Sequence, residues 1–325
     1  MITTDTPLRF DRPVRPGGYA WWYLDAVSDD GAIGLTIIVF VGSVFSTRYA
    51  RARRAGAGDP ERHCAVNVAI YPRGGARRIW TMAEHGDFVR DREHLRVGAS
   101  AIRWRDDALE VELDERRTRF FGRAGAPIRG RVRLHPSARF GPRIELDRWR
   151  SEGARHRWYP VAPHARVEVE LDEPGLRFSG SGYHDVNEGD EGLEQGFDSW
   201  TWSRSELGDE AVILYDVVDP AGEVHPRGWR FAANTQTTDV IEADALGPAL
   251  ALPSTRWGVG RSLRSDPGAT PILQRTLEDT PFYSRSLIET QLLGRACTTV
   301  HESLSLRRFA ARWVQLLLPF KTAAS

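Results

Sequence analysis

Alternating apolar and polar residues recur along most of this 325-residue chain. Residues 166–171 (RVEVEL) alternate strictly, and residues 128–135 (IRGRVRLH) alternate basic with apolar side chains. Residues 33–45 (IGLTIIVFVGSVF) and 64–71 (CAVNVAIY) are rich in β-branched residues, which favour strands. Because successive side chains of a strand point to opposite faces, a period of two predicts strands with one buried face.

Turn-forming residues separate these segments, for example Asp-Asp-Gly at 29–31 and Asp-Asp at 106–107. Short strands at this spacing, with almost no helical periodicity, predict an all-β fold of the sandwich or barrel type. The length suggests two such units, which we place at residues 1–150 and 151–325, with the junction inside residues 146–161.

The C-terminal segment departs from this pattern. Residues 305–320 (SLRRFAARWVQLLLPF) have the period of an amphipathic helix, with arginines beside the apolar stripe. A basic amphipathic helix can lie on a membrane surface, and it can equally close the end of a barrel, so both interpretations stay open. The stripe consists of Leu306, Phe309, Ala310, Trp313, Val314 and Leu317.

Composition narrows the classes of function. The chain has 44 basic and 44 acidic residues, so no overall charge draws it to nucleic acid. Two cysteines and nine histidines without ligand spacing do not indicate a metal site. The sequence contains no phosphate-binding glycine motif, so it does not indicate a nucleotide cofactor. Since the chain shows neither a secretory-type leader nor an apolar run long enough to span a bilayer, we expect a cytoplasmic protein.

Candidate chemistry concentrates in residues 178–204 (FSGSGYHDVNEGDEGLEQGFDSWTWSR). Tyr183 and Asp185 are two residues apart and therefore share one face of a strand. A carboxyl group buried among aromatic rings is disfavoured in its charged form and can act as a general acid. The more ordinary interpretation is an aspartate that caps a turn.

A second pair with the same spacing, His156 and Trp158, precedes this stretch. The two pairs together supply a base, an indole, a phenol and an acid, although a histidine between two arginines is more often simply solvated. Other aromatic residues could line a cavity, yet aromatic residues on strands more often belong to the core. The candidate substrate-binding residues are Tyr19, Trp21, Trp200 and Trp202.

Several long segments of the chain carry a family signature. They are residues 16–31 (PGGYAWWYLDAVSDDG), 34–46 (GLTIIVFVGSVFS), 63–71 (HCAVNVAIY), 182–204, 280–290 (TPFYSRSLIET) and 300–309 (VHESLSLRRF). On these segments the chain resembles the carotenoid 1,2-hydratases, also called hydroxyneurosporene synthases, and the likeness covers most of its length. The resemblance implies two consecutive lipocalin-like β-barrel or sandwich units followed by the C-terminal amphipathic helix. It also implies that His156, Trp158, Tyr183 and Asp185 take part in catalysis.

The implied enzyme is a hydro-lyase that adds water to the terminal C1=C2 double bond of acyclic carotenes such as neurosporene or lycopene, without a cofactor or metal. An isolated alkene offers no carbonyl to polarise, so carbon has to be protonated and a tertiary cation stabilised. We expect Asp185 to deliver the proton. The rings of Trp158 and Tyr183 would then stabilise the cation, and His156 would orient water and accept its proton.

Such a substrate dissolves in lipid, so peripheral contact with the inner or intracytoplasmic membrane is a further expectation. Two other functions fit the same features. One is a cofactor-free pericyclic cyclase of the same fold, and the other is a lipocalin-type carrier that binds a long apolar ligand without chemistry. Hydration adds water to the ligand, cyclisation leaves its mass unchanged, and a carrier forms no product.

Overall fold

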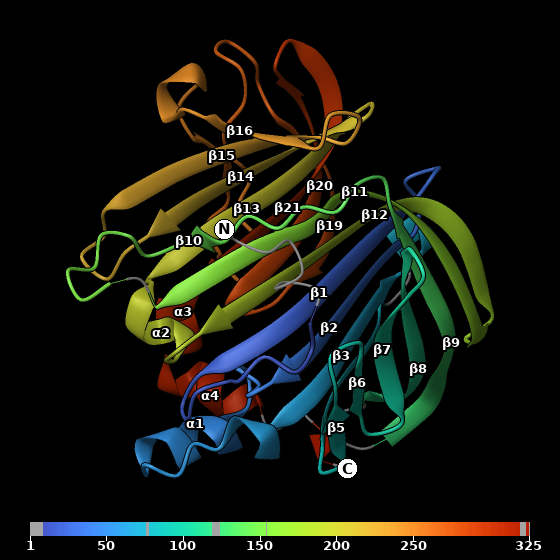
Figure 1. The fold of residues 1–325 in the computed structure, drawn as a ribbon. Coiled ribbons are helices and arrows are strands. Elements are labelled where there is room, and N and C mark those ends of the chain that lie inside the picture. Colours follow the sequence, from blue (N-terminus) through green and yellow to red (C-terminus); the bar gives the residue numbers. More distant parts are fainter. Residues whose placement is uncertain (1–8, 76–77, 119–123, 154, 319–322, 325) are drawn as a thin grey trace. The chain divides into compact units, whose positions relative to one another are not determined.

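The computed structural model describes residues 9–75, 78–118, 124–153, 155–318 and 323–324 (Figure 1). The chain forms two compact units, Met1–Gly192 with Leu316–Ser325 and Leu193–Gln315. They divide at Gly192 and not at the expected 150/151 boundary, because the long hairpin of β11 (His156–Glu173) and β12 (Leu176–Gly189) extends the sheet of the first unit.

One sheet of 13 strands makes up most of the first unit. Its spatial order is β22-β4-β3-β2-β1-β12-β11-β9-β8-β7-β6-β5, with β10 beside β11, and every pair is antiparallel except β22 with β4. Besides β11 and β12, the strands are β1 (Tyr19–Ser28), β2 (Gly34–Val41), β3 (Cys64–Tyr71), β4 (Ile79–His85), β5 (Phe88–Arg90), β6 (His94–Val97), β7 (Ser100–Arg105), β8 (Ala108–Thr118), β9 (Ala124–Pro136), β10 (Ile144–Glu145) and β22 (Ala323–Ala324).

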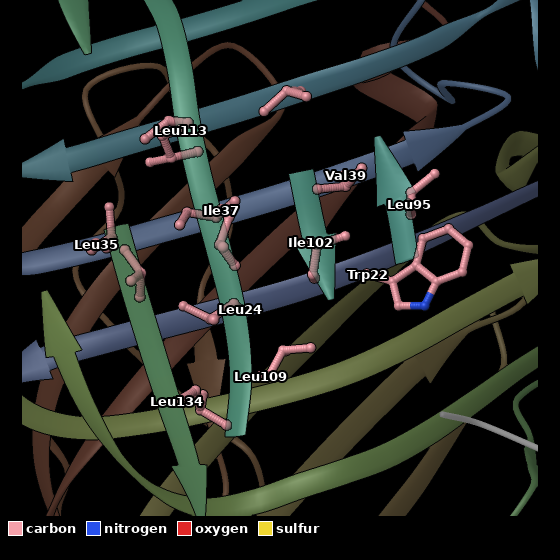
Figure 2. Close-up of a cluster of buried hydrophobic side chains, with 14 of the residues drawn as sticks. Trp22, Leu24, Leu35, Ile37, Val39, Leu95, Ile102, Leu109, Leu113 and Leu134 are labelled. Atoms are coloured by element: carbon pink, nitrogen blue, oxygen red, sulfur yellow. The ribbon is translucent and has the colours of Figure 1, made fainter. Parts of the chain in front are cut away.

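The sheet curls around a core of mainly aliphatic side chains that come from strands at both ends of the spatial order (Figure 2). Trp22 and Leu24 of β1 belong to this core together with Leu95 of β6, as the alternating pattern predicts. Trp104 of β7 and His184 of β12 also meet, with ring centroids 5.9 Å apart. One face of β1 and β12 is therefore committed to the core, and the other face is left for different side chains.

Short helices connect the first strands. They are α1 (Thr47–Arg54), η2 (Pro60–Arg62) and η3 (Arg73–Gly75). Ser46 caps α1 by accepting a hydrogen bond from the backbone N–H of Tyr49 at 3.0 Å. The buried Tyr49 hydroxyl donates to the carbonyl of Gly18 at 2.5 Å, so α1 is fastened to the start of β1.

The second unit contains a seven-stranded antiparallel sheet with the order β16-β15-β14-β13-β21-β20-β19 and a separate β17–β18 pair. Its strands are β13 (Ser199–Leu207), β14 (Glu210–Val218), β15 (Val224–Ala232), β16 (Thr237–Ile241), β17 (Leu250–Ala251), β18 (Ser262–Leu263), β19 (Ile272–Asp279), β20 (Tyr283–Leu292) and β21 (Arg295–Ser305). Its helical segments are α2 (Leu193–Gly196), η5 (Ala243–Ala245), α3 (Leu306–Phe309) and α4 (Arg312–Leu317), the last of which runs two residues past Gln315. The prediction of an all-β protein with a helical C-terminal segment is confirmed.

The single amphipathic helix expected at residues 305–320 is two short helices instead. Ser305 caps α3, and Ala310 and Ala311 separate α3 from α4. Residues 319 and 320 lie outside the described residues. Of the predicted stripe, Leu306, Phe309 and Val314 are buried, whereas Trp313 and Leu317 are exposed. Within the described parts of the chain, no helix is long and apolar enough to cross a membrane.

Candidate active site

The face of β12 that turns away from the aliphatic core carries Tyr183, Asp185 and Asn187. The intervening Val186 belongs to the core cluster, and His184 packs against a core tryptophan. The spacing of two predicted this shared face for Tyr183 and Asp185. All three polar side chains are nevertheless buried, so both faces of this part of β12 are shielded from water.

Asp185 is the centre of a hydrogen-bond cluster. Its Oδ2 accepts from the Tyr183 hydroxyl at 2.6 Å and from Nε1 of Trp158 at 2.8 Å. Its Oδ1 lies 2.9 Å from the side-chain amide nitrogen of Asn187. The carboxyl group is only 4% exposed, and Trp158 and Tyr183 are fully buried. These partners compensate the cost of removing the carboxyl group from water, and they stabilise negative charge on it.

A second tyrosine–aspartate pair lies next to the first. On β1, Tyr23 is directly opposite Asp185, and Asp25 is directly opposite Tyr183. The Tyr23 hydroxyl donates to Oδ2 of Asp25 at 3.2 Å, and the rings of Tyr23 and Tyr183 make an edge contact with centroids 5.9 Å apart. Two antiparallel Tyr-x-Asp pairs therefore form one buried block on neighbouring strands.

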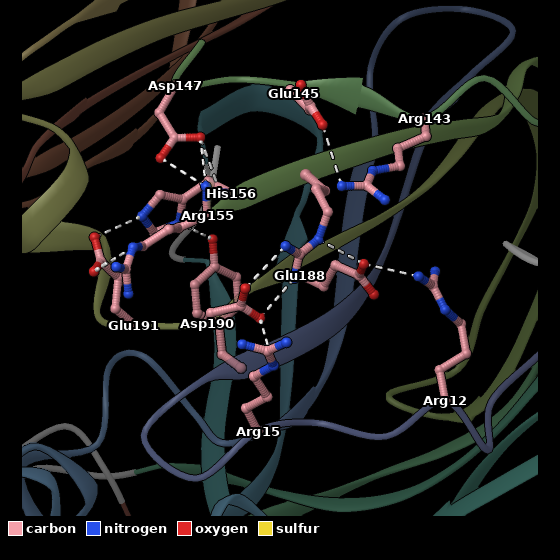
Figure 3. Close-up of polar contacts among 12 residues, drawn as sticks. Arg12, Arg15, Arg143, Glu145, Asp147, Arg155, His156, Glu188, Asp190 and Glu191 are labelled. Atoms are coloured by element: carbon pink, nitrogen blue, oxygen red, sulfur yellow. Dashed lines mark hydrogen bonds and ion pairs between the residues drawn. The ribbon is translucent and has the colours of Figure 1, made fainter. Parts of the chain in front are cut away.

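His156 begins β11 and belongs to a different polar cluster (Figure 3). Its backbone N–H donates to Oδ1 of Asp147 at 3.0 Å, and its Nε2 lies 3.6 Å from Oε1 of Glu191. The contact with His156, followed by that with Arg150, holds the pKa of Glu191 below its usual value in spite of partial burial.

The other ring nitrogen of His156, Nδ1, lies 2.9 Å from the hydroxyl of Tyr19. Burial raises the pKa of Tyr19 well above its usual value, so the hydroxyl keeps its proton. Gly189 makes the contact possible, because a Cβ there would lie 2.4 Å from the Tyr19 ring and 2.8 Å from Nδ1 of His156.

His156 is not adjacent to Asp185. Its partner on β12 is Gly189, four residues from Asp185, which corresponds to roughly 13 Å along the strand. Trp158 shares the face with His156 and lies between them, since it donates to Asp185. The structure thus brings Trp158, Tyr183 and Asp185 together and leaves His156 at the end of the row.

The side of β11 opposite His156 carries a charged clamp, which is also visible in Figure 3. Arg157 donates to Glu188 at 2.8 Å and to Asp190 at 2.8 Å. Arg12 and the Tyr159 hydroxyl also bind Glu188, at 2.7 and 2.9 Å. The hydrogen bond from Arg157 lowers the pKa of Asp190. These carboxylates are engaged in holding the ends of β11 and β12 in register.

The substrate-binding candidates fall into both units. Tyr19 and Trp21 continue the row of Tyr23 along β1, and their rings stack with centroids 4.8 Å apart. Trp200 and Trp202 belong to β13 in the second unit, where Trp200 makes edge contacts with other aromatic rings and Trp202 is buried. A role in binding substrate remains a prediction for all four.

One group of side chains in the second unit has a composition suited to a metal ion. Asp219, Glu223 and His225 lie in and beside the turn that joins β14 to β15. Asp219 already accepts from the backbone N–H groups of Ala221 and Glu223 and lies 3.2 Å from Nε2 of His225. These hydrogen bonds account for the group as a capped turn.

Sequence reasoning overlooked Asn187 and Asp25. Asn187 follows the Tyr-x-Asp motif at the same spacing of two, so the face rule that joined Tyr183 to Asp185 also applied to it. Asp25 ends the sequence Tyr23-Leu24-Asp25, which repeats the Tyr-x-Asp pattern. The pattern was visible, but nothing in the sequence shows that the two motifs become neighbouring strands.

Comparison with known proteins identifies relatives over most of the chain. The model of the carotenoid hydratase family CrtC matches residues 37–324. The acyclic carotenoid 1,2-hydratase of Rubrivivax gelatinosus is 44% identical over 322 residues, covering 96% of this chain and 75% of that protein. The acyclic carotenoid 1,2-hydratase of Thiocapsa roseopersicina is 45% identical over 316 residues, with the same coverage of 96% and 75%.

Among solved structures, the AttH protein from Nitrosomonas europaea superposes on this chain with a TM-score of 0.61. The alignment covers 94% of this chain and 97% of that one, at 14% sequence identity. The superposition shows a shared fold, and at this low sequence identity it carries no conclusion about activity.

Proposed function

This chain belongs to the carotenoid hydratase family CrtC, and we propose that it adds water to the terminal C1=C2 double bond of acyclic carotenes such as neurosporene or lycopene. It is an enzyme of the hydro-lyase class. The observation that carries the proposal is the buried carboxyl group of Asp185, on which Trp158, Tyr183 and Asn187 converge.

Asp185 is the proposed proton donor. Protonating an unactivated alkene requires an acid whose conjugate base is well stabilised, because carbon is a weak proton acceptor. Tyr183 and Trp158 both donate to Oδ2, so they stabilise the carboxylate that remains when the proton leaves. The side-chain amide of Asn187 has an oxygen as well as a nitrogen, and with the amide turned over that oxygen can accept a hydrogen bond from a proton carried on Oδ1.

The tertiary cation formed at C1 needs stabilisation that does not react with it. Aromatic ring faces supply this, at about 2 kcal/mol or more per ring in a site without water. Trp158, Tyr183 and Tyr23 are the rings nearest to Asp185 in the strand register, and all three are buried. We therefore assign to these three rings the role of stabilising the cation.

The family resemblance makes His156 one candidate for the group that orients water and accepts its proton. Its ring nitrogens face Tyr19 and Glu191, and it lies four residues along the sheet from Asp185. A direct role in proton transfer would require a substrate or water that spans this distance. If His156 instead positions Tyr19 and the start of β11, no molecule has to span this distance.

The assay that tests the function follows Asp185→Asn with lycopene or neurosporene supplied in detergent or liposomes. The substitution keeps the size and most hydrogen bonds but removes the transferable proton, so hydration should fall by at least about 100-fold. Asp172→Asn is a matched control, because Asp172 is an exposed aspartate at the far end of the same hairpin. Product is identified by the added mass of one water molecule.

Each alternative function gives a distinct outcome in that assay. Wild-type protein that binds carotene and releases it unchanged would be a carrier. A product of unchanged mass but altered absorption would indicate a cyclase. Near-normal hydration by Asp185→Asn would contradict the assignment of the acid while leaving the reaction itself in place.

We also propose that the protein contacts membrane peripherally through its C-terminal region. Trp257 and Trp313 are 47% and 45% exposed, and their rings stack with centroids 6.3 Å apart. Arg308 covers the Trp313 ring at 5.9 Å, and Leu316 and Leu317 are exposed on α4. Exposed indoles beside arginines suit the lipid interface.

Sedimentation with liposomes containing phosphatidylglycerol tests this contact. The double substitution Trp257→Ser/Trp313→Ser should reduce the bound fraction, whereas Val240→Ser, which removes an even more exposed apolar side chain from β16, should not. Equal binding by both variants would contradict the proposed surface.

A further inference from the structure

Hydration requires two proton transfers, and Asp185 accounts for only the first. The second group has to remove a proton from the attacking water close to the same carbon atoms. Asp25 lies diagonally across from Asp185 on the adjacent strand, one strand spacing away and two residues along. Diagonal neighbours of this kind are roughly 7–8 Å apart. Two carboxyl groups separated by roughly 6.5–9.5 Å can act on one water molecule and one carbon centre in another group of hydrolytic enzymes.

The surroundings of Asp25 suit a water-binding group. Asp25 is 0% exposed, and Tyr23 donates to its Oδ2. Thr36 of β2 is directly opposite Asp25 on the same face and is 4% exposed. Its Oγ1 is buried and has no hydrogen-bond partner among the described residues. A buried hydroxyl beside a carboxyl group provides the polar contacts that hold an internal water molecule.

We propose that Asp25 is the general base of the reaction and that Asp25 and Thr36 hold the attacking water. This inference rests on the proposed hydratase function. In the forward reaction the O–H bond of protonated Asp185 breaks, and the alkene π electrons form a C–H bond at C2. Water then bonds to the cation at C1, and its proton passes to the Asp25 carboxylate. The proton returns to Asp185 by exchange with solvent, which restores both groups.

Asp25 fits this role better than His156 for two geometric reasons. His156 is separated from Asp185 by four residues along the strand, whereas Asp25 is separated by two. The His156 ring nitrogens face Tyr19 and Glu191. In addition, two neighbouring carboxyl groups disfavour simultaneous ionisation, which suits one proton donor paired with one acceptor.

The decisive experiment measures hydration and hydrogen exchange together in D₂O. Without its base, Asp25→Asn should still protonate the alkene, but the cation loses a proton from C2 and returns to carotene more often than it captures water. We expect hydration to fall by about 100-fold or more. Deuterium should meanwhile accumulate at C2 of the recovered carotene, at a rate similar to wild-type turnover. Asp185→Asn should lose both hydration and exchange.

Further variants keep the test informative if Asp25→Asn folds poorly. Thr36→Val removes only the water anchor and should show the same separation of exchange from hydration, with a smaller loss of about 10-fold for one hydrogen bond. Thr36→Ser should lose less than Thr36→Val. Asp172→Asn should behave as wild type in both measurements.

Three results would separate this inference from the proposed function. Normal hydration by Asp25→Asn, with Asp185→Asn inactive, would overturn the base assignment and leave the hydratase function intact. Exchange without hydration in His156→Gln, but not in Asp25→Asn or Thr36→Val, would return the role to His156. Absence of hydrated product from wild-type protein would overturn the function itself.

Discussion

Strands β1 and β12 each have an apolar face and a polar face, and successive residues along each strand belong to these two faces in turn. Leu24 of β1 lies in the aliphatic core, whereas the next residue, Asp25, lies in the buried polar block. On β12, Val186 belongs to the core and its neighbour Asp185 accepts the converging hydrogen bonds. The same two strands therefore provide both the stability of the first unit and its candidate site.

The difference shows how a costly group can be kept out of water. Burying a leucine side chain stabilises a fold by about 1.5–3 kcal/mol, whereas burying a polar group without partners costs several kcal/mol. Many apolar side chains on the core face of β1 and β2 are buried, and each contributes stabilisation of this kind (Figure 2). On the other face, hydrogen bonds from Trp158, Tyr183 and Asn187 reduce the cost of burying the carboxyl group of Asp185. Substitutions on the two faces should therefore have separable effects.

The largest expected effect is on the core face. Leu24→Ala leaves a cavity among tightly packed aliphatic side chains and should lower the free energy of unfolding by about 2–5 kcal/mol. Activity per folded molecule should stay close to wild type, because Leu24 points away from the polar block. Chemical denaturation and initial rates measured on the same samples check both statements. A loss of activity without a loss of stability would contradict the separation of the two faces into a stabilising face and a catalytic face.

The next effect concerns a polar residue on the core face. Burial lowers the pKa of His184 to about 4, against an ordinary value of 6.5, and its hydrogen bond with the carbonyl of Tyr23 opposes this only partly. The unfolded chain therefore binds the proton more readily between these values. The stability contribution is complete above pH 6.5 and is lost as the pH falls toward 4.

Wild type should accordingly lose about 2 kcal/mol relative to His184→Gln between pH 7 and pH 5. The difference between the two proteins isolates His184 from other titrating groups, such as the similarly buried His301 of the second unit. Free energies of unfolding at several pH values provide the measurement. A constant difference across that range would show that His184 does not carry the effect.

The smallest expected effect is seen by comparing substitutions of two tryptophans, one on each face. Trp158→Phe keeps an aromatic ring and removes the N–H that donates to Asp185, so kcat/KM should fall by about 10-fold, equivalent to about 1.4 kcal/mol. Trp22 lies on the core face, and its Nε1 has no hydrogen-bond partner among the described residues. Trp22→Phe should leave kcat/KM unchanged. Equal losses in both variants would mean that ring size matters and the N–H does not.

Part of the candidate site could be predicted from the sequence because strand geometry is local. The spacing of two placed Tyr183 with Asp185 and His156 with Trp158 on common faces, since side chains alternate along a strand. The relation between the pairs was not predictable in the same way. Which strand lies beside which, and in what register, depends on contacts between residues that are far apart in the chain.

The register decided three matters. It set Trp158 opposite Asn187, where its indole N–H reaches Asp185, and it left His156 beside Tyr19. It brought Asp25 next to Tyr183 across 158 positions of sequence, 183 minus 25. The C-terminal segment shows a similar limit, because its helical structure was predicted while the break between α3 and α4 was not visible in the pattern.

For this protein, the sequence by itself determined the all-β class, the strands with one aliphatic face, and the residue types that can carry acid–base chemistry. These follow from the period of two and from side-chain chemistry, which every short segment contains. Only the tertiary structure decided that two Tyr-x-Asp segments become antiparallel neighbours. The physical reason is that strand pairing is fixed by burying the aliphatic faces of β1 and β12 in one core, and this burial aligns Asp25 and Asp185 on the face behind it.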